Sequence, residues 1–138
     1  LEKMDMPDSV NVSAGKEGVE VSFSRNVAFA QGSVELSKAV KETIDKMLPT
    51  IGPLTNDILI SGHTDSTDVN DRFPSNWEMS IARASAIATY LESKEIPTKR
   101  IQVAGFGDSR PRFFADTAYK RSLNRRVEIL LMPEDMQR

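Results

Sequence analysis

The sequence predicts an α+β sandwich, a small mixed β-sheet with helices packed on one face and elements in the order β-α-β-α-β-(α)-β. Apolar and polar side chains alternate over residues 19–23, as in a half-buried strand. Apolar side chains then recur at helical spacing over residues 36–48. Ser75 followed by Glu78 three residues later is a helix start signal. Because helices alternate with strands, we expect crossover connections.

The first helix and the first strand follow from simple periodicities. The strand is predicted at Val19, Val21 and Phe23, and a turn region follows. The helix is predicted over residues 36–48, because its apolar side chains share one face: Leu36, Val40, Ile44, Met47 and Leu48. Pro49, Gly52 and Pro53 are expected to end it.

The second helix has the clearest start signal in the chain. Ser75 is a good N-cap and Glu78 falls at N3, which makes a capping box. We expect the helix to end near Lys94, before a proline. Its predicted buried stripe consists of Ile81, Ala84, Ala88 and Leu91.

Three further strands are expected, at residues 57–61, 100–106 and 127–132. Between the last two lies a long basic loop over residues 107–123, with one helical turn predicted around residues 117–123. Residues 1–17 are polar and are interpreted as a linker or approach segment, residues 18–133 as one domain, and residues 134–138 as a C-terminal tail.

Composition excludes several classes of protein. The net charge of -2 argues against nucleic acid as the main partner, and the absence of cysteine excludes disulfides and thiolate metal sites. That absence fits an oxidising compartment. No apolar run approaches the roughly 18 residues of a membrane span, and the first residues lack the apolar region of a signal peptide. The chain is therefore expected to be cytoplasmic, or a fragment of a longer exported or membrane-anchored protein.

A pair of opposite charges is expected where the strand at 57–61 leads into the second helix. Asp65 follows the strand end, and Asn76, Ser80 and Arg83 share one helix face beside the apolar stripe. An aspartate accepts hydrogen bonds from an ammonium, and an arginine holds a carboxylate through two donors. Together they suit an amino-acid head group. The alternative is that Asp65 and Arg83 pair with each other, or that Asp65 caps a turn.

His63 is the only histidine and has three readings. It could act as a base beside Asp65, but no G-x-S-x-G motif is present. It could bind a metal with Asp65 and Asp68, but no second histidine is available. We favour a structural hydrogen-bonding role, and therefore expect neither an enzyme nor a metal or cofactor site.

Three other features carry weaker signals. Gly105-Phe106-Gly107 is interpreted as a strand end and not as a phosphate loop. Trp77, at N2 of the second helix, is interpreted as a packing anchor in preference to a sugar platform. A basic cluster is either a solvated loop or a contact for an anionic polymer, with Arg125 or Arg126 bracing the Asp65 loop; its members are Arg110, Arg112, Lys120, Arg121, Arg125 and Arg126.

Five blocks, in order and spacing, resemble the OmpA-like peptidoglycan-binding domain over roughly residues 18–132. They are Phe29 with Gly32-Ser33 and Leu36; Gly62-His63-Thr64-Asp65; Asn76-x-x-Met79-Ser80-x-x-Arg83-Ala84; Gly105-Phe106-Gly107 with Pro111; and Arg121-x-x-Asn124-Arg125-Arg126-Val127-Glu128. The chain departs from the family pattern in three ways: Met79 replaces a leucine, Lys120 replaces the glycine before Arg121, and no asparagine follows Pro111 at the family spacing.

The resemblance implies a periplasmic module that binds the peptide stem of the cell wall without cutting it. It implies that Asp65 and Arg83 hold the two charges of diaminopimelate, and that Asn76 and Thr64 line the same pocket. The residues that it implies as supports of the site are Ser80, Asn124, Arg125 and Arg126.

Residues 71–80 also resemble the R-F-x-S-N-W-E-L-S segment of flagellar motor stator B subunits, the MotB/PomB family. This implies the periplasmic domain of a single-span inner-membrane protein that works as a homodimer. Its partner would be the stator A subunit, reached through a membrane segment outside this sequence. The alternative is an OmpA-like wall anchor of another envelope complex, such as a Pal-type lipoprotein or a secretion-system component.

Overall fold

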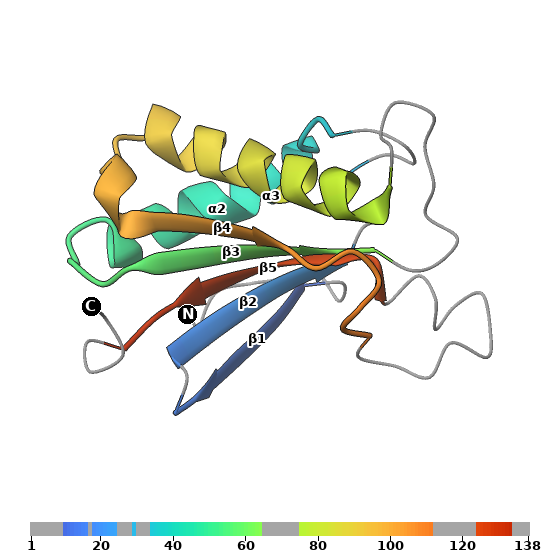
Figure 1. Ribbon diagram of the computed structural model, residues 1–138. Coiled ribbons are helices and arrows are strands. Elements are labelled where there is room, and N and C mark those ends of the chain that lie inside the picture. Colours follow the sequence, from blue (N-terminus) through green and yellow to red (C-terminus); the bar gives the residue numbers. More distant parts are fainter. Residues whose placement is uncertain are drawn as a thin grey trace.

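In the computed structural model, one five-stranded mixed sheet carries helices α2 and α3 on one face (Figure 1). The structure describes residues 10–16, 18–24, 29, 34–64, 75–111 and 124–133. The elements are β1 (Val10–Gly15), β2 (Gly18–Ser24), α2 (Lys38–Ile51), β3 (Ile58–His63), α3 (Asn76–Ser93), the 3-10 turn η1 (Thr98–Arg100), β4 (Ile101–Gly105) and β5 (Arg126–Leu131). The predicted α+β class, with a mixed sheet and helices on one face, is confirmed.

The strand order is β1-β2-β5-β3-β4, which puts the last strand of the chain at the centre of the sheet. Strand β5 pairs antiparallel with both β2 and β3. Strands β3 and β4 run parallel, and α3 connects them as a crossover. The carboxyl ends of β3 and β4 therefore lie side by side, next to the start of β5.

Alternating side chains of the central strands fill the core. Phe23, Ile60 and Val127 are at most 1% exposed, and they face the two helices. Helix α2 contributes one buried stripe, in which Val40 and Ile44 are fully buried. Burying one such side chain contributes about 1.5–3 kcal/mol. This apolar layer holds both helices on one face of the sheet.

Strand β1 corrects the interpretation of residues 1–17 as a linker, which is wrong for Val10–Gly15. These residues pair antiparallel with β2, from Val10 opposite Phe23 to Gly15 opposite Gly18. The side chain of Val10 is 7% exposed and joins the core. The apolar alternation here is short and ends in an alanine, so the signal is weak, and the hairpin with β2 is what makes this segment a strand.

Helix α2 begins as its capping residue indicates but runs past its predicted end. The Ser37 hydroxyl accepts a hydrogen bond from the Val40 N–H at 3.2 Å. Pro49 lies inside the last turn, and the helix ends at Ile51. A proline this close to a helix end removes one backbone donor, while Ile51, 2% exposed, adds a core contact. The expectation that Pro49 ends the helix is therefore wrong.

The start and end of α3 are confirmed. The Ser75 hydroxyl accepts from the Trp77 N–H at 3.2 Å and donates to the Glu78 carboxylate. This hydrogen bond from the Ser75 hydroxyl, helped by backbone N–H groups, lowers the pKa of Glu78 below its ordinary value. The helix ends with Lys94 as its C-cap. Both capping residues thus carry out the roles that their sequence context predicts.

The predicted buried stripe of α3 is wrong at Ile81, which is 46% exposed. The buried face consists of Met79, Ser80, Arg83, Ala84, Ile87 and Leu91. Counting apolar residues alone missed this face, because its N-terminal half carries the polar Ser80 and Arg83. A polar side chain on a buried face needs a partner of its own.

The other three strands appear within a residue or two of their predicted bounds. The helical turn expected around residues 117–123 lies outside the described residues, as do the tail at 134–138 and residues 1–9. Of the helices in the described ranges, none combines the length and the apolar composition that a membrane crossing requires.

Replacing Ser75 with alanine is expected to lower the free energy of unfolding by about 1 kcal/mol, because the first turn of α3 loses its cap. Urea denaturation followed by circular dichroism measures this loss. Thr89→Ala changes an exposed residue inside the same helix and is the matched control, expected to leave stability unchanged or slightly higher. If Ser75→Ala were as stable as the parent, Ser75 would not stabilise α3 as an N-cap.

Candidate functional site

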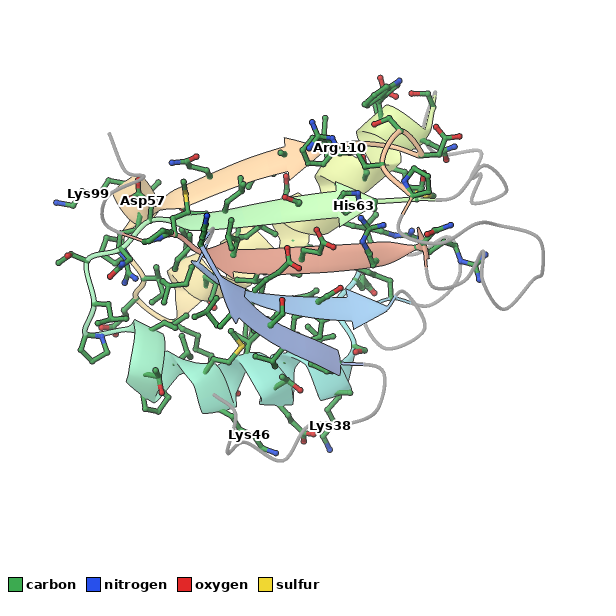
Figure 2. The ribbon with its side chains drawn as sticks, turned by 90° about the horizontal axis from the view of Figure 1, so that it is seen from below. Lys38, Lys46, Asp57, His63, Lys99 and Arg110 are labelled. Carbon is green, nitrogen blue, oxygen red and sulfur yellow. The ribbon has the colours of Figure 1, made fainter. Side chains whose placement is uncertain are left out.

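The predicted site lies at one end of the sheet, where β3 and β4 end and α3 begins. Figure 2 shows His63 and Arg110 at this end, away from Asp57 and Lys99 at the other. Thr64 directly follows β3, and Asn76 is the first residue of α3. Parallel strands that share a crossover helix place the end of β3 and the start of α3 at the same edge of the sheet.

Helix α3 packs closely against β3 because residue 62 is a glycine. A Cβ atom at Gly62 would lie 2.1 Å from the Ser80 carbonyl oxygen, which is shorter than any tolerated contact. Ser80 is fully buried. Its hydroxyl donates to the Trp77 carbonyl at 2.9 Å and accepts from the Gly107 N–H at 3.0 Å. The supporting role expected for Ser80 thus has a physical basis, since Ser80 joins α3 to the turn after β4.

The turn after β4 is held from two sides. The Gly107 carbonyl accepts a hydrogen bond from the Thr64 N–H at 2.7 Å, and the Gly107 N–H donates to Ser80. The backbone of Thr64 therefore has a fixed position immediately before Asp65. The Thr64 hydroxyl is buried and has no hydrogen-bond partner among the described residues. Leaving a buried hydroxyl unpaired costs about 1–3 kcal/mol, so such an atom calls for an explanation.

Arg83 lies deeper than its sequence position indicates. Its side chain is 2% exposed, although it was expected at the edge of the core. The guanidinium carbon lies 5.4 Å from the centroid of the Phe29 ring, which is also 2% exposed. This geometry permits a cation–π contact. An arginine guanidinium carries a positive charge in proteins, so the site holds a permanent positive charge.

The shared face predicted for Asn76, Ser80 and Arg83 exists, with Asn76 half-buried in the first turn. Asp65 lies outside the described residues. Its expected position opposite Arg83 therefore stays a prediction, as does the alternative in which the two side chains pair. Asp68, named in the metal reading of His63, also lies outside the described residues.

Behind this edge, on the sheet face opposite the helices, His63 forms a buried cluster with the charged side chains of Arg126 and Glu128. Arg126 Nε donates to Glu128 Oε2 at 2.6 Å. His63 Nε2 lies 3.2 Å from Glu128 Oε1, although its geometry does not meet that of a hydrogen bond. His63 and Arg126 are cross-strand partners, so adjacent positions of β3 and β5 build the cluster.

Arg126 also braces the chain around it. Its other nitrogens donate to the Asn124 carbonyl at 3.3 Å and to the Arg110 carbonyl at 3.0 Å. Asn124 is buried and Arg125 is half-buried. Arg126 thus links β5 to the loop after β4, while its expected bracing of the Asp65 loop stays a prediction. The interpretation of the basic cluster as a solvated loop does not hold for Arg126, because its side chain is buried.

Burial alone would raise the pKa of Glu128, but contacts with His63 and Arg126 outweigh it and lower the pKa to about 2. Glu128 is therefore ionised at neutral pH. The sequence-based reading did not single out this residue. Its spacing from Arg126 could have predicted the pair, because residues two apart on a strand lie on the same face.

The ring of His63 stacks on Phe106, with centroids 5.2 Å apart and planes inclined by 15°. The Arg110 guanidinium carbon lies 4.1 Å from the centroid of the same Phe106 ring. His63 thus packs and pairs at the strand end, which agrees with a structural role. Within the described part of the chain, no group of three acidic or histidine side chains is placed to hold a metal ion.

Residues 28–125 match the OmpA family, which is most of the chain. Two curated relatives come from Bacillus subtilis (strain 168). The uncharacterized protein YtxE is 36% identical over 118 residues, covering 84% of this chain and 49% of YtxE. Motility protein B is 34% identical over 122 residues, covering 85% of this chain and 46% of that protein. The chain therefore spans about half the length of the curated relatives it matches.

A solved structure shares the fold closely. The cell wall anchor of the T6SS from Pseudomonas aeruginosa superposes with a TM-score of 0.83 at 27% identity. The superposition covers 91% of this chain and 89% of that one.

Glu128→Gln is expected to show a stability deficit that depends on pH. Because the pKa of Glu128 is lower in the folded protein than the ordinary 4.5, its charge stabilises the fold above about pH 4.5. That stabilisation is lost as the pH falls from there towards about 2. Urea denaturation at pH 7, 5, 4 and 3 should show the parent and variant converging at the acidic end. A difference that stays constant with pH would exclude this ion pairing.

Proposed function

The protein belongs to the OmpA family, and on that premise we propose that it is a non-catalytic module that binds the peptide stem of peptidoglycan. In this role it anchors a larger envelope assembly to the cell wall. The observation that carries the proposal is the buried guanidinium of Arg83, on the helix that packs against the strand leading to Asp65.

The proposed ligand head group is that of diaminopimelate, with Arg83 on its carboxylate and Asp65 on its ammonium. The backbone of Thr64, the residue before Asp65, is fixed through Gly107. Arg83 is held by its burial and by the ring of Phe29. Preorganised charges need little ordering on binding, which favours affinity.

Thr64 and Asn76 complete the proposed pocket. The buried hydroxyl of Thr64, which has no partner in the described ranges, is available to hydrogen-bond a polar ligand group. The half-buried Asn76 side chain carries both a donor and an acceptor. The supports behind the ligand are Ser80, Asn124, Arg125 and Arg126. The hydrogen bonds from the Gly107 N–H to Ser80 and from Arg126 to Glu128 illustrate this role.

For the parent assembly we propose a flagellar motor stator. The segment at 71–80 and the 34% identity to motility protein B support this reading. With this assembly we also propose that the protein is a homodimer, that its partner is the stator A subunit, and that the domain is periplasmic and linked to a single inner-membrane span. The second candidate is an anchor of another envelope complex, favoured by the likeness to the cell wall anchor of the T6SS. Co-purification of the full-length protein with an A-type stator subunit distinguishes the two.

A single charge clamp gives modest affinity, since charge-assisted hydrogen bonds contribute about 1.5–3 kcal/mol each before the costs of association. Two or more modules on one assembly raise the effective affinity by acting together. Retention on the wall is then a property of the assembly. An enzymatic role would require release of soluble fragments from purified sacculi, and we expect none.

We predict that changes to the clamp abolish co-sedimentation with purified sacculi, lowering affinity at least about tenfold. Because Arg83 is buried, Arg83→Ala would leave a cavity. Arg83→Met keeps most of the volume and removes the charge, and Arg83→Lys keeps the charge and loses the two-donor geometry. Asp65→Asn removes the opposite charge.

Lys99→Met serves as the matched control, because it removes an exposed cation at the other end of the sheet (Figure 2) and should bind like the parent. Circular dichroism and urea denaturation identify the variants that remain folded. A folded Arg83→Met or Asp65→Asn variant that co-sediments like the parent would refute the clamp.

A further inference from the structure

Trp77 is the only tryptophan in the chain, and its side chain is 51% exposed. It occupies the second position of α3, directly after Asn76 of the proposed stem pocket. A packing anchor, the role favoured from the sequence, would be buried. The exposure of so large an apolar side chain beside a ligand pocket is what the sugar-platform reading requires.

The ring of Trp77 is nevertheless held in place. Gly107 has a φ of +56°, and a Cβ atom there would lie 3.4 Å from Trp77 Cδ2 and 3.5 Å from Cε3. The indole therefore rests on the Gly107 turn. That turn is fixed by Thr64 and Ser80, which also build the stem pocket. Part of the indole is thus backed by protein, and half of the side chain faces solvent.

Ile81 extends this apolar surface by one helical turn. Its side chain is 46% exposed and rests on Gly105, where a Cβ atom would lie 2.3 Å from Ile81 Cγ1. Residues i and i+4 of a helix lie on the same side. Trp77 and Ile81 thus form a narrow ledge. The residues next to the ledge in the chain, and those that follow the Gly107 turn, are polar and exposed: Ser75, Glu78, Asp108 and Ser109.

From this arrangement we propose that Trp77 is a saccharide subsite, which packs against an amino-sugar ring of the glycan strand while the attached stem occupies the pocket at Arg83. This inference rests on the proposed function and deepens it. A pyranose ring presents a face of C–H groups that packs on an aromatic ring, and its hydroxyl and N-acetyl groups need polar partners at the rim. The exposed neighbours of the ledge supply such partners.

The size and position of the ledge favour a sugar over a protein. Protein partners usually cover about 800 Å² on each side, which two apolar side chains with a polar rim do not offer. Trp77 and Arg83 are six residues apart on α3, a rise of about 9 Å. The two stem residues between the sugar's lactyl group and diaminopimelate reach about 7 Å when extended, and the lactyl group adds the rest. The stem therefore matches the separation of the two positions along the helix axis, and their side chains lie about 120° apart around it.

Because Trp77 is the sole tryptophan, the intrinsic fluorescence of the 138-residue chain reports directly on this subsite. We would titrate two purified probes: a disaccharide tripeptide ending in diaminopimelate, and the same tripeptide without sugars. The disaccharide probe is expected to change the emission strongly, and the bare tripeptide only weakly. Calorimetry should show about three- to tenfold tighter binding of the disaccharide probe.

Trp77→Ala is expected to remove that difference in affinity while binding of the bare tripeptide stays as in the parent. Trp77→Phe, which keeps an aromatic face, should retain part of the difference. Leu54→Ala, at an apolar residue that is 40% exposed and precedes β3, is the matched control and should leave both affinities unchanged.

The outcomes separate this inference from the proposed function. If the parent binds both probes equally and Trp77→Ala changes neither affinity, the saccharide subsite is overturned while stem binding stands. If the parent binds neither probe, the proposed function fails and the subsite falls with it. Emission that depends on protein concentration without any probe would assign the ledge to a second copy of the chain, which also overturns the proposal.

Discussion

The close packing of α3 on β3 is the constraint on which the site depends. It requires a glycine at position 62, because any side chain there would meet the backbone of Ser80. The same contact brings the Ser80 hydroxyl within hydrogen-bond distance of Gly107. Helix, strand end and turn are thereby joined through one buried hydroxyl. Since backbone groups make most of these bonds, the site has a rigid frame.

The buried charges of Arg83 and Glu128 have different surroundings. On the helix side, Arg83 is buried against an aromatic ring and keeps a permanent positive charge. On the opposite face of the sheet, the ionised Glu128 accepts a hydrogen bond from Arg126 and lies beside His63. The second arrangement ties β5 to the neighbouring loop, because Arg126 also donates to the Arg110 carbonyl. Removing one partner from such a cluster is costly, because it leaves a buried charge uncompensated.

The glycines flanking Phe106 connect the charge site to the surface beside it. Gly105 and Gly107 leave room for Ile81 and Trp77, which remain half-exposed on the outside of α3. Phe106 itself points the other way and stacks with His63. A single short turn thus supports the proposed stem pocket, the proposed sugar surface and the charged cluster behind them.

The sequence by itself determined the elements that depend on local chemistry. Neighbouring residues are enough to predict the alternation of β2 and the N-cap of α3 at Ser75. The family blocks can likewise be identified from their order and spacing in the sequence. Tertiary structure decided what depends on distant contacts. Helix α3 has two faces of similar periodicity, and its packing at Gly62 buries Arg83 and exposes Ile81. Residues 10–15 become a strand only through pairing with β2. Burial is a property of the partner surface, and local periodicity carries no information about that surface when polar side chains are the ones buried.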